Sequence, residues 1–145
     1  MRLNLHTDYA LRVLMYLARE ERQASVDEIA DAFAISRHHL MKVARQLAAL
    51  GHVEARRGRG GGLALARPAE QIRVGQVIRE LESLSSFVEC FDAGNGRCRI
   101  AGGCGLQGAL NLALGDFLAR LDTYTLADLV PDRARFDRLL GMAAG

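Results

Sequence analysis

The chain has 145 residues, of which half are apolar and a quarter are charged, and its formal net charge at pH 7 is +2. This composition predicts a folded chain, and the length fits one small domain, alone or with an oligomerisation element. No apolar run approaches the roughly 20 residues that span a bilayer, and the amino-terminal segment lacks the cleavage site of a signal peptide. We therefore expect a cytoplasmic protein with no membrane partner.

Positive charge is concentrated in the first half of the chain. Residues 36–67 contain seven basic residues against one acidic residue, whereas residues 81–145 contain six basic and eight acidic residues. A local cationic surface on a nearly neutral protein is typical of phosphate binding. An ordinary solvated face is the alternative interpretation of the same charges.

The first fifty residues have the pattern of three short helices. Thr7 can cap the first helix, and Ser25 with Glu28 fits a capping box for the second. Ser36 can cap a third helix, which is expected to end near Gly51. Apolar residues recur between these caps at the spacing of one helical face.

The second and third helices are joined by a very short turn, which is the arrangement of a helix-turn-helix motif. In that motif the amino-terminal end of the later helix enters the major groove of DNA. An arginine there can bind guanine through two hydrogen bonds, and its polar and basic neighbours can reach bases or phosphates. The candidates for these contacts are Ser36, Arg37, His38, His39 and Lys42. Antiparallel helix pairs also occur in proteins that never bind DNA, so the motif alone is only moderately specific.

A basic, glycine-rich hairpin is predicted next. Residues 52–68, HVEARRGRGGGLALARP, read as two short strands around a cationic turn. Consecutive glycines allow backbone amides to approach a phosphate closely. A helix-turn-helix followed by such a hairpin is a winged helix, whose wing contacts phosphates or the minor groove. The candidate DNA-binding residues of the wing are Arg56, Arg57, Arg59, Gly60 and Gly61.

Two further helices are predicted after the wing. Residues 72–82 carry an apolar stripe that should pack on the winged helix. Residues 106–124 carry a near-heptad seam, which we expect to be buried against a second copy of the chain in a homodimer. Burial against the chain's own domain is the alternative. The seam consists of Leu106, Leu110, Ala113, Leu114, Phe117, Leu121 and Tyr124.

All three cysteines, Cys90, Cys98 and Cys104, lie in one glycine-rich segment. Their clustering argues against inert buried thiols, and in a reducing compartment it favours metal binding or redox chemistry over a disulfide framework. Structural zinc sites usually pair cysteines about two to four residues apart, whereas the gaps here are seven and five residues. Thiolates spread around a larger object suit an iron–sulfur cluster. Zinc and a reversible disulfide are the alternatives.

An enzyme that uses these thiols is the competing class of function. No nucleotide-binding glycine fingerprint follows a predicted strand, no C-x-x-C pair occurs, and no order of Ser, His and Asp suggests a nucleophile. We therefore predict that the chain is not an enzyme.

Five segments together resemble the NsrR/IscR-type family of iron–sulfur transcription regulators. They are TDYALRVLMYLA, SRHHLMKVARQLAALGHVEARRGRGGGLALARP, IRVGQVIRELE, the three-cysteine loop and LDTYTLADLV, which lie within residues 1–131. The last segment brings the chain nearest to the NsrR-type nitric-oxide-sensing repressors. The resemblance implies a homodimer that binds double-stranded operator DNA, with nitric oxide as its signal. It also implies a cluster, [4Fe–4S] favoured over [2Fe–2S], ligated by Cys90, Cys98 and Cys104.

The resemblance points to Asp8, in the TDY motif, as a fourth ligand contributed by the partner subunit. Asp8 could instead simply interact with the dipole of its helix. Arg12, one turn later, can pair with Asp8 and hold its orientation. Other candidates for the fourth ligand are His6, Glu89 and Asp92.

The chain departs from the family pattern at two places. Seven residues separate its first two cysteines, where the family usually has five. Gln107 stands where IscR-type members carry a histidine ligand three residues after the third cysteine, which argues against that branch. The alternatives for function are a regulator that responds to thiol redox state or iron status, and a zinc-bound winged-helix protein.

The predicted fold is mainly α-helical with a small β-hairpin wing, a winged helix-turn-helix followed by a long dimerisation helix. We expect a DNA-binding domain at residues 1–82 and a cluster-binding loop at 83–105. The dimerisation helix and a short following helix are expected at 106–131, and a carboxy-terminal tail at 132–145.

Overall fold

The computed structural model describes residues 3–92 and 97–142. Within these ranges it contains six α-helices and one two-stranded antiparallel hairpin, joined by short 3₁₀ turns. The mainly α-helical winged-helix architecture predicted from the sequence is therefore confirmed. The elements are α1 Leu5–Glu20, α2 Val26–Phe33, α3 Arg37–Ala49, β1 Val53–Arg56, β2 Gly62–Leu65, α4 Val74–Leu81, α5 Gly105–Asp122 and α6 Arg133–Leu139.

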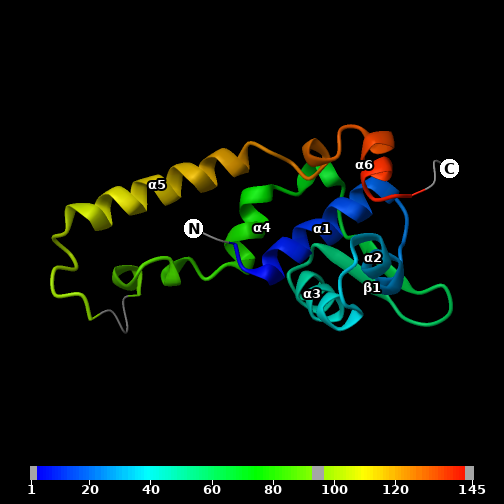
Figure 1. The fold of residues 1–145 in the computed structure, drawn as a ribbon, viewed down its shortest axis with the longest axis horizontal. Helices are drawn as coiled ribbons and strands as arrows, with labels where there is room; N and C mark the ends of the chain where they lie inside the picture. Colours follow the sequence, from blue (N-terminus) through cyan, green and yellow to red (C-terminus); the bar gives the residue numbers. More distant parts are fainter. Residues whose placement is uncertain (1–2, 93–96, 143–145) are drawn as a thin grey trace.

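The molecule consists of a body and an arm (Figure 1). Helices α1 to α3 and the hairpin form the body, and α6 returns to pack on it. From α4 the chain runs out along the arm through the cysteine segment and comes back as α5 (Figure 1). The cysteine segment therefore lies at the far end of the arm, away from the hairpin.

Helix α1 is the central element of the body. It contacts α2, α3, α4 and β2, and its side chains Leu14, Tyr16 and Leu17 are almost completely buried. Leu40 and Leu47 of α3 are buried in the same core. Burial of one such side chain contributes about 1.5–3 kcal/mol, so the packing on α1 fixes the position of α3.

The helix caps agree with two of the three sequence predictions. The backbone amide of Glu28 donates to Ser25 Oγ at 3.0 Å, and that of His39 donates to Ser36 Oγ at 3.2 Å. The predicted cap at Thr7 is wrong, because α1 begins at Leu5 and Asn4 Oδ1 accepts from the Thr7 amide at 2.8 Å. Asparagine caps a helix as well as threonine does, and it lies where the chain turns from extended to helical backbone.

Helix α3 ends in a turn that only glycine adopts easily. Gly51 has a φ of 75°, and the Gly51 amide donates to the Ala48 carbonyl at 3.1 Å. The His52 amide donates to the Leu47 carbonyl at 2.9 Å, which completes a Schellman motif. The motif reverses the chain directly into β1, so one glycine sets the angle between α3 and the wing.

His52 is fully buried at this turn. Its Nε2 lies 2.5 Å from Glu80 Oε2 of α4, and Arg67 Nη2 lies 3.1 Å from its Nδ1. A neutral ring that accepts from Arg67 and donates to Glu80 satisfies both contacts. Desolvation raises the pKa of Glu80, but hydrogen bonds from Gln76 and His52 outweigh it and hold that pKa below its ordinary value. His52 thereby joins the end of α3 to α4.

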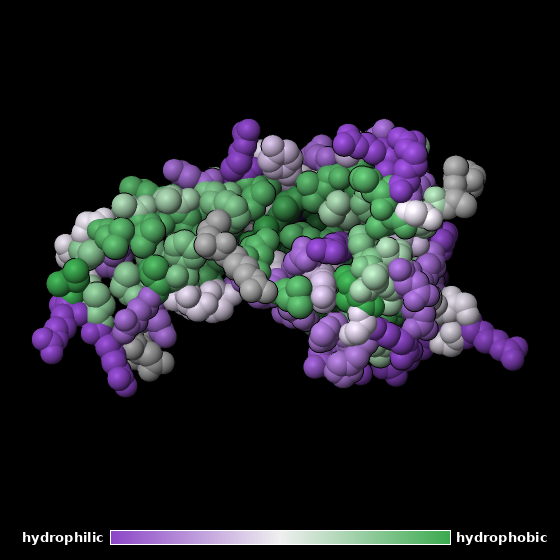
Figure 2. Space-filling model, viewed as in Figure 1, coloured by the Kyte–Doolittle hydropathy of each residue, from purple (hydrophilic) through white to green (hydrophobic). Residues whose placement is uncertain are grey.

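The long helix α5 is covered in part by its own chain. Leu114, Phe117 and Leu121 of the seam pack against the cluster of Val74 and Ile78 from α4, so this part of the seam is covered by the chain's own domain. Leu106 is 66% exposed and Leu112, which was not assigned to the seam, is 73% exposed. Figure 2 shows apolar side chains along the arm. Dimerisation through α5 stays a prediction.

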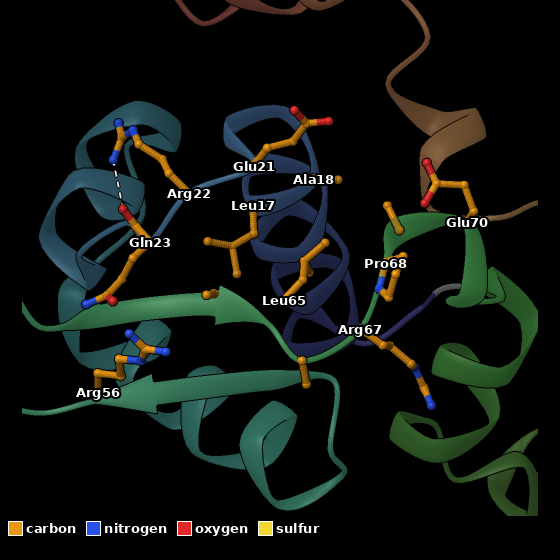
Figure 3. Close-up of a pocket in the computed structure, with 13 residues that line it drawn as sticks. Leu17, Ala18, Glu21, Arg22, Gln23, Arg56, Leu65, Arg67, Pro68 and Glu70 are labelled. Atoms are coloured by element: carbon orange, nitrogen blue, oxygen red, sulfur yellow. Dashed lines mark hydrogen bonds between the residues drawn. The ribbon is translucent and has the colours of Figure 1, made fainter.

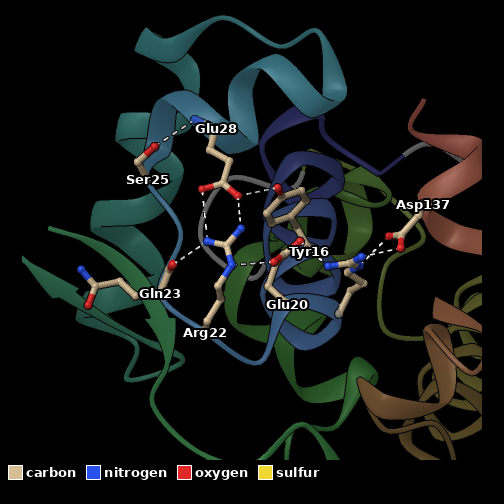
Figure 4. A network of polar contacts seen from close by, with 8 residues as sticks. Tyr16, Glu20, Arg22, Gln23, Ser25, Glu28 and Asp137 are labelled. Carbon is tan, nitrogen blue, oxygen red and sulfur yellow. Dashed lines mark hydrogen bonds and ion pairs between the residues drawn. The ribbon is translucent and has the colours of Figure 1, made fainter. Parts of the chain in front are cut away.

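Residues 133–142 pack on the body. Phe136 of α6 lies edge-on to Phe33 of α2, with ring centroids 6.5 Å apart. Arg19 of α1 donates two hydrogen bonds to the Asp137 carboxylate, and Arg19 and Arg22 both bind Glu20. Figure 4 shows that this chain of contacts continues through Arg22 to Glu28 and Tyr16. A polar network thus connects α6 with the start of α2.

We expect Asp137→Asn to destabilise the protein at neutral pH and to make its acid unfolding shallower. The Arg19 guanidinium beside Asp137 holds the pKa of that carboxyl below its usual range. A depressed pKa contributes stability that is present above the unfolded-state value of about 3.9 and is lost as pH falls through the folded-state value. Urea unfolding at pH 7 and at several acid pH values measures both effects.

Glu21→Gln is the matched control for this prediction. Glu21 also binds an arginine of α6, Arg133, but the two side chains are 65% and 52% exposed, and exposed pairs contribute little. Equal stability losses for the two variants would contradict a specific role of the Arg19–Asp137 pair.

No helix among the described residues combines the length and the apolarity needed to cross a membrane.

Candidate DNA-binding surface and cysteine site

The first turns of α3 present a polar, solvent-facing end. Ser36 caps the helix, and the buried side chains Leu40, Val43 and Leu47 hold the opposite face against the core. This amphipathic spacing leaves the amino-terminal end free to contact a partner. All five residues predicted for DNA contact on this helix are exposed: Ser36, Arg37, His38, His39 and Lys42.

An open groove of about 810 Å³ lies between α3 and the hairpin. Basic side chains from both elements line it, namely Arg37, Arg45, Arg56 and Arg57. Guanidinium groups that converge on one groove from two elements suit the phosphates of a nucleic acid backbone. The groove also contains Asp27 of α2, whose carboxylate lies 2.5 Å from Arg37 Nε.

The tip of the wing is anchored by backbone contacts. The Gly61 amide donates to the Gly58 carbonyl at 2.9 Å, so this amide is already engaged within the turn. The side chain of Gln23, in the segment between α1 and α2, also holds the tip, because its Nε2 donates to the Gly60 carbonyl at 2.6 Å. The predicted wing residues Arg56, Arg57, Arg59 and Gly60 are exposed, and Gly61 is half-buried.

His39 contacts α1 as well as solvent. Its ring centroid lies 6.1 Å from that of Tyr9, and both residues line a small hollow of about 220 Å³ with His6 and Lys42. The Arg12 guanidinium lies 6.0 Å from the Tyr9 ring centroid. The face of α1 that carries Arg12 and Tyr9 is therefore in direct contact with the start of α3.

A second hollow, of about 590 Å³, is lined by the end of α1, by β2 and by residues 66–70. Figure 3 shows Arg67 pointing away from this hollow, and its guanidinium contacts His52, which binds Glu80 of α4. Arg22 Nη1 donates to the Gln23 carbonyl at 2.9 Å. Of the three arginines that line this hollow, Arg22 and Arg67 are thus bound to other groups of the chain, and Arg56 also lines the groove beside α3.

Asp8 lies in the first turn of α1 and forms the predicted contact with Arg12. Arg12 Nη2 lies 2.7 Å from Asp8 Oδ2, and the two side chains are 43% and 42% exposed. Among the described residues Asp8 does not belong to a group of potential metal ligands within its own chain. Its role as a ligand from a partner subunit, and the orienting role of Arg12, stay predictions.

The three cysteines occupy three different local structures. Cys90 lies in the 3₁₀ turn Glu89–Phe91. Cys98 is the second residue of the described range 97–142, and Cys104 is the residue before α5. All three are free thiols with partly exposed side chains. Among the described residues, however, the three thiols do not come together as a group that could hold a metal ion. The chemistry of the donor set fits the predicted cluster, because iron–sulfur clusters and zinc prefer thiolate ligands.

Two side chains tie the cysteine segment together. Glu89 Oε1 accepts from the Arg97 amide at 2.9 Å. Gln107 Nε2 donates to the Cys90 carbonyl at 2.9 Å, and Gln107 Oε1 accepts from the Gly102 amide at 2.9 Å. These contacts link the backbone at Cys90 to residues that lie next to Cys98 and near Cys104.

Sequence reasoning did not assign several residues that the structure places at these sites. Arg45 could have been found, because it follows Arg37 by eight residues and so shares its helical face. Asp27, Gln23 and Tyr9 reach the site from other elements, and no local pattern indicates contacts between side chains from different elements. The sequence shows Gln107 only as a departure from the family's histidine and does not indicate its contacts.

A helix-turn-helix whose exposed recognition helix shares a basic groove with a β-hairpin defines a winged-helix DNA-binding regulator. Residues 3–132 match the Rrf2 family, described as iron-dependent transcriptional regulators, and the chain belongs to this family. The resemblance predicted from the motifs is thereby confirmed.

Relatives and solved structures support this placement. The HTH-type transcriptional regulator NsrR of Bacillus subtilis is 46% identical over 144 residues, 98% of this chain and 99% of the relative. NsrR of Geobacillus kaustophilus is 47% identical over 142 residues, 97% of each chain. The structure of CymR, the global cysteine regulator of B. subtilis, superposes with a TM-score of 0.72 at 26% identity, covering 90% of this chain and 97% of that one. T. potens IscR, at 24% identity, shares the fold with a TM-score of 0.71 over 100% of this chain and 94% of that one.

Proposed function

We propose that the chain is a homodimeric transcriptional repressor whose iron–sulfur cluster senses nitric oxide, and that damage to the cluster releases operator DNA. The observation that carries the proposal is the gathering of three free thiols in one segment of a winged-helix chain. Similarity to regulators named NsrR over almost the full length supports the choice of signal.

Cys90, Cys98 and Cys104 would hold the cluster, with Asp8 of the partner subunit as the fourth ligand. When bound, the cluster would supply iron that reacts with nitric oxide. A carboxylate is a hard ligand beside three soft thiolates, so the Asp8 corner is the more weakly held one. Arg12 pairs with Asp8 and can keep its carboxylate oriented in both states.

The position of Asp8 provides a physical link to the DNA-binding surface. Asp8 lies on α1, which packs directly against α3, and the neighbouring Tyr9 contacts His39 at the start of α3. Loss of the bond between Asp8 and the cluster would therefore shift α1, the helix that supports α3. Two half-sites about one DNA turn apart, near 34–36 Å, must be bound together, so a small change in spacing lowers operator affinity strongly.

The homodimer is expected to cover apolar surface that the single chain leaves open on the arm. Leu106 and Leu112 of α5 and Ile100 of the cysteine segment are each more than half exposed. Exposed apolar surface of this kind is typical of a protein interface. A second copy would bury it and would also bring the partner's α1 to the cysteine segment.

The proposal is tested by purifying the protein without oxygen. Visible absorption, iron content and operator binding are measured before and after adding nitric oxide. We expect brown protein that bleaches and releases its operator. Colourless protein that holds zinc or no metal and still binds DNA would keep the winged helix and contradict the sensing mechanism.

Asp8→Ala tests the proposed link between the two sites. We expect this variant to bind DNA more weakly and to lose most of its response to nitric oxide, whereas Asp8→Glu, which keeps a carboxylate, retains part of it. An Asp8→Ala variant that binds DNA and responds like the wild type would contradict the link.

A further inference from the structure

We propose that Gln107 and Glu89 are positioning residues that hold together the backbone segments carrying the three cysteines, from which the thiols would reach a cluster. The inference rests on the proposed function, which supplies the cluster. Gln107 lies on the first turn of α5. Both ends of its side-chain amide bind the protein backbone, and we call these contacts, together with that of Glu89, the clamp.

The two hydrogen bonds of Gln107 fix the orientation of its side-chain amide. The amino group donates to the Cys90 carbonyl and the oxygen accepts from the Gly102 amide, each at 2.9 Å. The flipped amide would oppose two donors at one end and two acceptors at the other, so only one orientation satisfies both contacts. One side chain thereby holds Cys90, seventeen positions earlier in the chain, against the start of α5, which follows Cys104 directly.

Glu89 forms the complementary contact. It precedes Cys90, and its carboxylate accepts from the amide of Arg97, which precedes Cys98. A hydrogen bond to a charged group is stronger than one between neutral groups. Glu89 therefore joins the first and second cysteines, Gln107 joins the first and third, and the Ala101 amide binds the Cys98 carbonyl at 3.2 Å.

The clamp spans the long gap between the first two cysteines. The contact from Glu89 to Arg97 holds the residue before Cys90 beside the residue before Cys98 without the use of a thiol. Phe87 and Phe91, stacked with centroids 6.0 Å apart, brace the same turn.

The clamp also separates Gln107 from the ligand set. Both ends of the Gln107 amide are occupied by backbone groups, whereas Glu89 uses one carboxylate oxygen for its backbone contact. A side chain held in this way acts on the cluster through the cysteine backbone. Gln107 thus stabilises the segment by a different mechanism from a metal-ligating histidine at this position.

The first test uses apo-protein and does not depend on the cluster. Gln107→Leu removes both contacts at similar side-chain volume, and we expect hydrogen exchange of the Gly102 amide to accelerate about fivefold, the effect of one typical net hydrogen bond. Glu89→Leu is expected to accelerate exchange of the Arg97 amide, whereas Glu89→Gln keeps an acceptor oxygen and stays near wild type. Gln76→Leu, which removes a side-chain amide bound to Glu80 in α4, is the control and leaves both amides unchanged.

The second test uses protein reconstituted with iron and sulfide. We expect Gln107→Leu to transfer iron to a chelator roughly 25-fold faster than wild type, the combined effect of two lost hydrogen bonds, with Glu89→Gln and Gln76→Leu near wild type. Unchanged exchange in apo-protein, or faster exchange without faster iron loss, would overturn the positioning role. A wild-type protein that takes up no iron would contradict the proposed function, and the exchange rates would still decide whether the clamp exists.

Discussion

Replacing Gly75 by alanine is expected to lower the free energy of unfolding by roughly 2 kcal/mol, the cost of inserting a methyl group into a close-packed site. A Cβ at this position of α4 would lie 2.2 Å from Asp122 Oδ1 and 2.9 Å from the Asp122 amide nitrogen. The side chain of Asp122 could move, but its backbone could not. The Val74 amide donates to the Tyr124 carbonyl at 3.1 Å, and the Leu126 amide donates to the Ile72 carbonyl at 2.8 Å.

The expected consequence reaches beyond stability, because Gly75 sets the distance between α4 and the end of α5. Urea unfolding measures the free energy of unfolding. Operator binding tests whether the orientation of α5 relative to the DNA-binding body is preserved. Arg79→Ala is the control, since it removes the ion pair to Asp122 without adding atoms at the contact. The two side chains of that pair are 40% and 38% exposed, so we expect a much smaller loss. Equal losses for the two variants would show that the ion pair, and not the close approach, determines the geometry.

The local parts of the fold were predictable from sequence because their causes are local. Ser25 and Ser36 cap their helices as predicted, and Gly51 ends α3 because it adopts a positive φ without strain. At Thr7 the local signal was ambiguous, since Asn4 is an equally good cap three residues earlier. Such an ambiguity moves an element boundary but leaves the fold unchanged.

The burial of α5 could not be predicted from the same kind of pattern. An apolar stripe indicates that a helix face is covered, but it does not indicate what covers it. Leu114 and Phe117 pack on α4 of the same chain, although their spacing fits a coiled-coil seam equally well. Leu118 is the buried residue of this helix, and it lies beside the predicted seam. The face of α5 that contacts α4 is therefore rotated about the helix axis relative to the seam.

At the candidate sites, too, features with a local cause were predictable and contacts between elements were not. Exposure of the recognition helix follows from its apolar face, which the sequence displays. The contacts from Asp27 to Arg37 and from Gln107 to Cys90 join different elements, and their partners depend on the folded arrangement. Single polar side chains of this kind carry no periodic signal, so the sequence indicated the candidate DNA-contacting and sulfur-donor residues but not the side chains that contact them.

Arg37→Ala is expected to weaken binding to the operator by about tenfold to a hundredfold, while binding to unrelated DNA falls much less. A bidentate arginine–guanine contact is worth about 1–3 kcal/mol of discrimination, and Arg37 stands at the exposed start of α3 beside the basic groove. Arg57→Gln should weaken binding to both DNAs equally and reduce the slope of log affinity against log salt by about 1, because a phosphate contact carries no sequence information. Titrations with operator and random duplexes at several salt concentrations distinguish the two behaviours.

Asp27→Asn tests whether the Asp27 carboxylate orients Arg37 for its contact with a base of the operator. The side chains of this pair are each 63% exposed, so the pair itself adds little stability, but the Asp27 carboxylate restricts the direction of the guanidinium and places a negative charge inside the groove. Its removal should strengthen binding to random DNA, since one repulsive charge is lost, and should lower the ratio of operator to random affinity, since Arg37 is less restricted. If the ratio stays at the wild-type value while both affinities rise together, Asp27 only repels phosphates, and the specificity of Arg37 must come from its position on α3 alone.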